Sequence, residues 1–161
     1  MPSPQRIAPF SYALEADLDV GDESIADARL IVLYNPDGDE SWEGCFRCVG
    51  LIRADVDVEM VTDPLLAEVA WSWLTDALTN CDASYCHLNG TVTSQSSRCF
   101  GLLDKDDTAE IEIRASWTPE IRQCDQITSH LRAWEGLTFI TAGQPFPDDQ
   151  IVPLTTRRLN S

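Results

Sequence analysis

Residues 109–120 read AEIEIRASWTPE, and this stretch decides the fold more than any other in the chain. Apolar residues occupy every second position and polar residues the positions between, with Ala109, Ile111, Ile113, Ala115 and Trp117 set against Glu110, Glu112, Arg114 and Ser116. A period of two is that of a β-strand with one buried face. Thr118-Pro119-Glu120 then has the composition of a helix start. The stretch therefore predicts a half-buried strand followed by a helix that ends near Gly143.

Strand-like alternation and a helix-start signal also occur on the N-terminal side of this strand. Alternation predicts further strands over residues 12–20, 28–34, 42–58 and 91–100. Asp63 and Pro64 fit the cap and first turn of another helix, which is predicted to reach Thr79. Runs of strands joined by hairpins favour an antiparallel sheet, since parallel strands would need a crossover after each one.

These elements predict one α+β domain over residues 1–161. Its antiparallel sheet has about five strands, and two helices pack on one face in the order β-β-β-α-β-β-α. A chain of 161 residues has the usual size of one domain. Residues 1–8 and 155–161, at the two ends, are expected to be flexible.

The charge balance excludes some classes of partner. The chain carries 27 acidic and 11 basic residues, for a formal net charge of −16. Nucleic acids and anionic membrane surfaces are bound mainly through Lys and Arg, so we expect neither as a partner. No run of residues is apolar enough to span a membrane and no signal peptide is evident, so the expected location is the cytoplasm.

Six cysteines offer a possible metal site. Cys45 and Cys48 have CxxC spacing, and Cys81, Cys86 and His87 follow in a predicted loop, so these residues are weak candidates for zinc. In an extended strand, however, residues three apart point to opposite faces. Ordinary thiols in a reducing compartment are therefore the favoured interpretation, and no cofactor is expected. His130 lies beside an apolar helix stripe and is assigned to packing.

Arginines are the strongest candidates for a binding site. Arg47, Arg53 and Arg114 fall on the strand face predicted to point away from the helices. One interpretation is cross-strand pairing with acidic neighbours, namely Glu15, Asp17, Glu110 and Glu112. The other is a sheet face that binds an anionic peptide or ligand.

Tryptophans suggest a second surface. Apolar residues cover an unusually wide arc of the helix predicted over 64–79, and Trp71 widens that arc. Trp71 and Trp73 cannot both point the same way, so we expect one in the core and Trp71 available for an interface. The other helix or a second copy of the chain must cover the remaining face.

Several motifs resemble those of the actinobacterial domain-of-unknown-function 3000 family. They are Ala70-Trp71-Ser72-Trp73-Leu74-Thr75, Gly90-Thr91-Val92-Thr93 and Ile113-Arg114-Ala115-Ser116-Trp117-Thr118-Pro119. The resemblance covers nearly the whole chain and implies a bacterial cytoplasmic protein without an assigned activity. With the further N-terminal helix of that family, the order of elements is similar to that of type III secretion chaperones.

The leading functional hypothesis is a non-catalytic, acidic protein-binding or chaperone-like module, with a protein partner or a homodimer. The alternative is a small enzyme or ligand-binding protein with an anion site on the open sheet face. Neither a GxSxG nor an HExxH motif is present, which favours the first.

Overall fold

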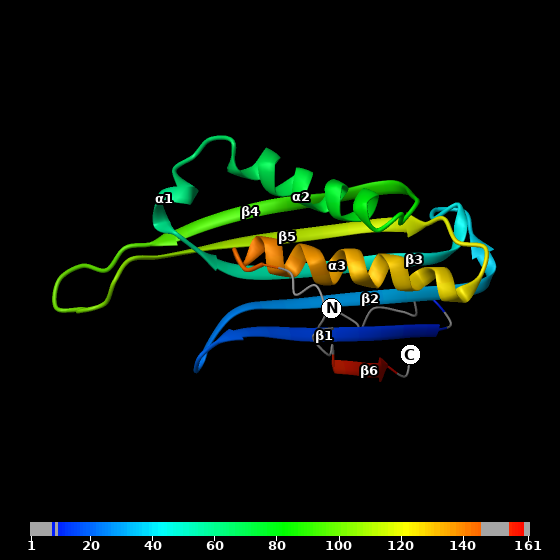
Figure 1. Ribbon diagram of the computed structural model, residues 1–161, viewed down its shortest axis with the longest axis horizontal. Helices are drawn as coiled ribbons and strands as arrows, with labels where there is room; N and C mark the ends of the chain where they lie inside the picture. The colour runs from blue at the N-terminus through cyan, green and yellow to red at the C-terminus, as the bar shows by residue number, and fades with distance from the viewer. Residues whose placement is uncertain (1–7, 9, 146–154, 160–161) are drawn as a thin grey trace, which may run out of the picture.

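The computed structural model describes residue 8, residues 10–145 and the backbone of residues 155–159. Its strands are β1 Phe10–Val20, β2 Glu23–Asp39, β3 Gly44–Val56, β4 Tyr85–Ser97, β5 Thr108–Pro119 and β6 Thr155–Leu159. Its helices are the short α1 Val58–Val61, α2 Leu66–Asn80, the single 3₁₀ turn η1 Cys124–Gln126 and α3 Ile127–Thr141. Helices α2 and α3 lie side by side on one face of the sheet (Figure 1).

All neighbouring strands are antiparallel, in the order β4-β5-β3-β2-β1-β6. The predicted α+β class, the five predicted strands and the two helices on one face are confirmed. A sixth strand, β6, pairs with β1 at the edge of the sheet. Of the two ends predicted to be flexible, residues 1–7 and 160–161 lie outside the described residues.

The core lies between the sheet and the two helices. Ile52 and Ile113, paired across β3 and β5, are fully buried there. Trp134 of α3 lies directly against Gly50 of β3, where the ring occupies the space that a Cβ would need. Trp134 also packs on Trp117, with ring centroids 5.6 Å apart. Gly50 therefore permits the close approach of α3 to the sheet.

The second helix begins later than the sequence predicts. Thr118 and Pro119 belong to β5, and α3 starts at Ile127. The Thr118 hydroxyl donates to the Trp42 carbonyl, which holds this segment in the sheet. The N-cap of the helical turn η1 is instead Gln123, whose backbone N–H donates to the side-chain oxygen of Gln126 in a capping box. A tertiary contact has thus overridden a local helix-start signal.

Strand β4 begins earlier than predicted, at Tyr85 rather than Thr91. Its pairing with β5 is interrupted between Cys86 and Asn89, and His87 has a positive φ of 52°. An irregularity of this kind shifts the side-chain alternation by one residue. The strand period was therefore hidden in the sequence, and His87 was wrongly placed in a loop.

Helix α2 starts close to its predicted position. The Asp63 carboxylate accepts a hydrogen bond from the Leu65 backbone N–H, but the N-cap of the helix is Leu65 rather than the predicted Asp63. The helix proper begins at Leu66, and it ends at Asn80, next to the predicted Thr79. Across the described residues no helix has both the length and the apolar character needed to cross a membrane.

Candidate functional site

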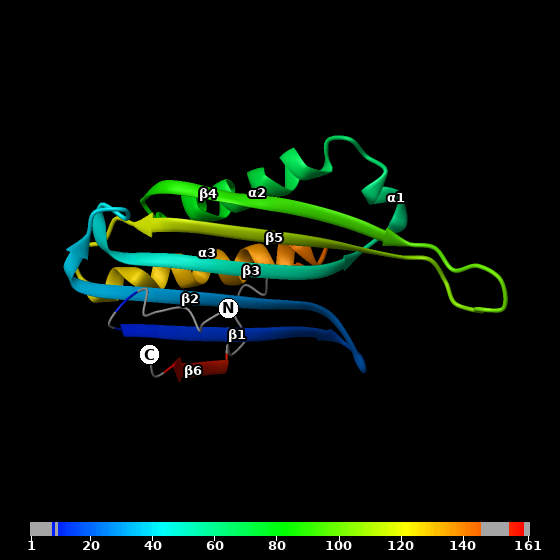
Figure 2. The ribbon, with the colours of Figure 1, turned by 180° about the vertical axis from the view of Figure 1, so that it is seen from behind.

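Among the described residues no helix covers the sheet face opposite α2 and α3 (Figure 2), and all three predicted arginines lie on that face. Gly50 and Ile52 of β3 point toward the helices, so Arg47 and Arg53, at odd positions of the same strand, point the other way. Arg114 lies opposite Leu51, on the same open face. The predicted orientation of the three side chains is thus correct, although their surroundings differ.

Arg53 and Arg114 share one carboxylate. Glu112 accepts hydrogen bonds from both Nε atoms, at 2.9 Å from Arg53 and 2.5 Å from Arg114. These bonds hold the pKa of Glu112 below its usual value, with Arg53 the larger cause. Cross-strand pairing with an acidic neighbour, one of the two interpretations, is therefore present here. Arg29 of β2 similarly lies 3.9 Å from Glu15 of β1.

Arg47 is the exception because it is buried, with only 8% of its surface exposed. Its Nε donates to the Ser116 hydroxyl at 2.8 Å, and its Nη1 donates to the Thr118 hydroxyl at 2.9 Å. Within the described residues no carboxylate pairs with it. Burial lowers the pKa of this guanidinium. Arg47 thus faces away from the helices as predicted, but its side chain is buried rather than exposed, because it packs against the two hydroxyl-bearing residues of β5.

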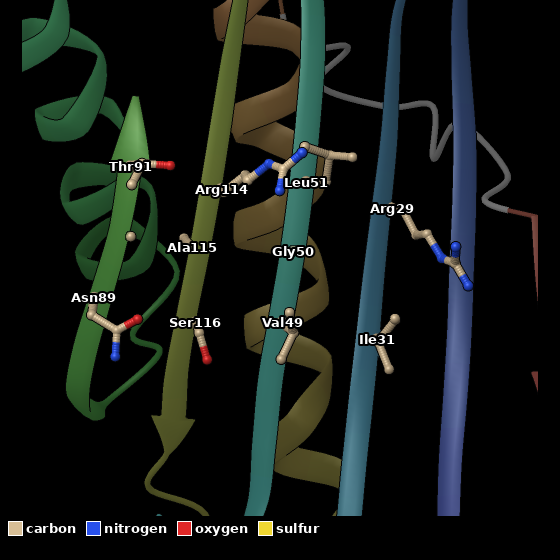
Figure 3. Close-up of a pocket in the computed structure, with 11 residues that line it drawn as sticks. Arg29, Ile31, Val49, Gly50, Leu51, Asn89, Thr91, Arg114, Ala115 and Ser116 are labelled. Carbon is tan, nitrogen blue, oxygen red and sulfur yellow. The ribbon is translucent and has the colours of Figure 1, made fainter. Parts of the chain in front are cut away.

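A shallow concavity of about 460 Å³ lies in the middle of the open face. Ile31, Val49 and Leu51 form its apolar floor. Arg29 and Arg114 come from strands on either side of β3, as Figure 3 shows. Asn89 and Ser116 lie together at one end (Figure 3). Ser116 also links the concavity to the buried Arg47, whose Nε bonds its hydroxyl.

The apolar floor of this concavity was missed by sequence reasoning. Ile31, Val49 and Leu51 occupy positions that a strand with one buried face assigns to polar residues. Val49 is 38% exposed, so an apolar β-branched side chain reaches the surface here. The signal was present as the unbroken apolar run from Leu30 to Leu33, which is apolar on both faces of β2.

Trp71 is half-buried on the flank of α2 above β4, where its ring lies against Gly90. Trp73 is half-buried as well, so the expectation that one of this pair lies in the core is wrong. The fully buried positions of α2 lie between them, at Leu66, Ala70, Leu74, Ala77 and Leu78. Strand β4 and helix α3 both contact α2. The wide apolar face of this helix is therefore covered largely within the chain.

The cysteines do not assemble into a metal site among the described residues. Cys48 is fully buried in the core, and burial raises the pKa of its thiol to about 12. Cys45 is at the surface end of β3, Cys81 follows α2 and Cys86 lies on β4. All six cysteines have free thiols. His87 is hydrogen-bonded to Glu43 at 2.8 Å.

His130 has the packing role that was predicted. It is 1% exposed, and its Nδ1 accepts a hydrogen bond from Trp117 Nε1 at 3.0 Å. Burial lowers the pKa of His130 to about 4. The imidazole is therefore neutral near pH 7 and serves as an acceptor inside the core.

A family model matches residues 1–151, which is nearly the whole chain, and describes proteins of unknown function (DUF3000). The chain belongs to the DUF3000 family. No curated protein and no solved structure matches it. The likeness to type III secretion chaperones is therefore not confirmed, and the DUF3000 description assigns no activity to this chain.

Proposed function

We propose that this DUF3000 protein is a non-catalytic protein-binding module whose open sheet face holds an extended segment of a partner protein. The observation that carries the proposal is the concavity, with its apolar floor of Ile31, Val49 and Leu51, the guanidinium group of Arg114 beside that floor, and the side chain of Arg29 at its β2 edge. Partly exposed apolar residues next to oriented polar groups are typical of binding surfaces.

The lining residues argue against catalysis at this place. Among the described residues that form the concavity there is no histidine, cysteine, aspartate or glutamate. Thr91 and Ser116 supply hydroxyls, but neither has a general base among these neighbours, and an unactivated hydroxyl is a weak nucleophile. Binding is therefore the better supported role.

Charge favours carboxylates on the bound segment. Arg114 shares its only acidic partner with Arg53, and Arg47, behind Ser116, has none among the described residues. Ser116 and Asn89 provide further donors at that end of the concavity. The net charge of −16 opposes an acidic ligand at long range, but physiological salt screens charges beyond about 8 Å, so the local arginines dominate close contact. The bound segment is thus one that alternates apolar and acidic side chains.

Two short synthetic peptides test the proposed preference for a segment that alternates apolar and acidic side chains. In one, leucine alternates with aspartate, and in the other leucine alternates with lysine. Binding of the first should shift the backbone amide signals of Val49, Leu51 and Ser116 in ¹H–¹⁵N spectra. The double substitution Arg29→Ala, Arg114→Ala should weaken that binding at least about tenfold, the loss expected when charge-assisted hydrogen bonds are removed.

The matched control is Arg98→Ala with Arg122→Ala, which removes two exposed arginines outside the concavity. It should leave binding of the aspartate peptide unchanged. Equal binding of the lysine peptide, or shifts confined to the helical face, would refute the proposal.

A further inference from the structure

The concavity on the open sheet face has two different ends. Ser116 and Asn89, which are paired across β5 and β4, lie at one of them (Figure 3). One step farther along the same face, Thr118 of β5 and Arg47 of β3 are only 2% and 8% exposed. In the opposite direction the face continues to Arg53, whose side chain is 45% exposed. Along the strand direction, the concavity is thus closed at the Ser116 end and open at the other.

The closed end is covered by the connection between β2 and β3. Thr118 points to the open face, and its hydroxyl donates to the Trp42 carbonyl at 2.7 Å, so this connection lies against that face. Trp42 is buried, at 6% exposed, although it is not part of the core between the sheet and the helices. The neighbouring Glu43 is hydrogen-bonded at 2.8 Å to His87 of β4. The connection is therefore held from both β5 and β4.

Hydrogen-bond donors gather at the closed end. The Ser116 hydroxyl accepts from Arg47 Nε at 2.8 Å, and among the described residues it has no acceptor for its own O–H. Asn89 is exposed beside Ser116, and its side-chain amide offers a further N–H. A hydroxyl that accepts from a guanidinium is polarised, which makes its own O–H a stronger donor. The described residues that line the concavity include no carboxylate to accept these bonds.

Arg47 supplies a positive charge behind these donors. The exposed arginines of this face, Arg53 and Arg114, share the carboxylate of Glu112. Arg47 is the buried one, and no carboxylate of the described chain pairs with it. A buried charge without an opposite charge is unfavourable. An anion that entered the closed end from outside would offset this cost.

We propose that the closed end holds the C-terminal carboxylate of the bound segment, so that the partner protein is recognised by its C-terminus. Ser116 and Asn89 donate to the carboxylate, and Arg47 acts through Ser116 as a positioning residue. The last side chain of the segment lies on Val49, which is part of the apolar floor. This assignment rests on the proposed binding of a segment to the open face.

A chain terminus fits this end better than the middle of a segment does. A segment that continued past Ser116 would run into the connection that covers Thr118 and Arg47. A terminal amine is excluded by charge, because it would lie beside the guanidinium of Arg47 and face donors instead of acceptors. A terminal carboxylate satisfies both the donors and the charge.

Two peptides that differ only at the C-terminus test the assignment. Both are acetylated at the N-terminus, alternate leucine with aspartate and end in leucine. One carries a free C-terminal carboxylate and the other a carboxamide. In ¹H–¹⁵N titrations, the free acid should bind at least about tenfold more tightly, as expected for charge-assisted hydrogen bonds. A second pair, with asparagine in place of aspartate, should keep this ratio, which separates the terminal carboxylate from the side-chain carboxylates.

Variants of the chain locate the preference for the acid. Ser116→Ala and Arg47→Gln should each bring the ratio of the two affinities close to one. Ser94→Ala, which changes an exposed serine of β4 outside the concavity, is the matched control and should leave the ratio unchanged. Ser116 is only half-buried, so Ser116→Ala still gives the measurement should Arg47→Gln fail to fold.

The outcomes separate this assignment from the binding proposal beneath it. Equal affinities for the acid and the amide, with shifted amide signals of Val49 and Leu51 in both titrations, would overturn the terminal carboxylate and leave open-face binding intact. An acid preference that survives in Ser116→Ala would also overturn it. Absence of binding by either peptide would overturn both proposals.

Discussion

The two faces of the sheet are built from the same strands, yet they are stabilised in different ways. On the helix-covered face, Ile52 and Ile113 are fully buried, and Trp134 lies against Gly50. On the open face, Val49 and Leu51 alternate along β3 with Gly50 and Ile52, but they remain partly exposed. One face is thus closed by packing, whereas the other combines apolar surface with arginines. We therefore expect substitutions on the helix-covered face to cost more stability than substitutions on the open face.

The adjacent residues Ile52 and Leu51 allow a direct test of this difference. Ile52→Ala should lower the free energy of unfolding by about 2–5 kcal/mol, because it opens a cavity in a closed core. Leu51→Ala, on the open face, should cost on the order of 1 kcal/mol, because water already reaches that side chain. Urea titration of both variants measures the contrast. Equal losses would show that the open face is as important for stability as the covered one.

Acid should weaken the covered face through His130. Its pKa in the folded protein, about 4, lies below the ordinary value of 6.5. The unfolded chain therefore takes up a proton first, and stability is lost as the pH falls from about 6.5 to 4. The loss is of order 3 kcal/mol, and His130→Asn, whose Oδ1 can accept from Trp117 in place of Nδ1 but does not titrate, should remove it. Unfolding curves across this pH range would contradict the assignment if both proteins lost stability in parallel.

The smallest effect is expected on the open face. Glu112→Gln removes the shared partner of Arg53 and Arg114, whose side chains are 45% and 62% exposed. Exposed ion pairs stabilise little, so the free energy of unfolding should fall by less than about 1 kcal/mol. The difference should shrink further in about 1 M salt, which screens exposed charges. A salt-independent loss would indicate that Glu112 has a packing role instead.

Much of the fold follows from the period of the apolar residues. Alternation over 109–117 and 42–58 predicted strands β5 and β3, and it also predicted which of their residues point toward the helices. The predictions made from the sequence fail where a local signal competes with a longer-range contact. Thr118-Pro119-Glu120 has a helix-start composition, but the hydrogen bond from Thr118 to Trp42 keeps Thr118 in the sheet.

The candidate site was predicted only in part, for a related reason. The orientation of Arg53 and Arg114 follows from strand parity, whereas the burial of Arg47 depends on two hydroxyls supplied by β5. The apolar floor of the concavity joins Ile31 with Val49 and Leu51, which come from different strands. The register that brings them together is a property of the paired strands.

By itself, the sequence determined the α+β class, the antiparallel sheet and the faces on which the residues of β3 and β5 lie, because these depend on short periods along the chain. Tertiary structure alone decided that Trp71 and Trp73 both lie on the flanks of α2, that Arg47 is enclosed, and that Phe100 and Leu102, between β4 and β5, stay in water. Burial of a side chain depends on residues that are distant along the chain, and no local sequence pattern specifies where those residues lie in the folded protein.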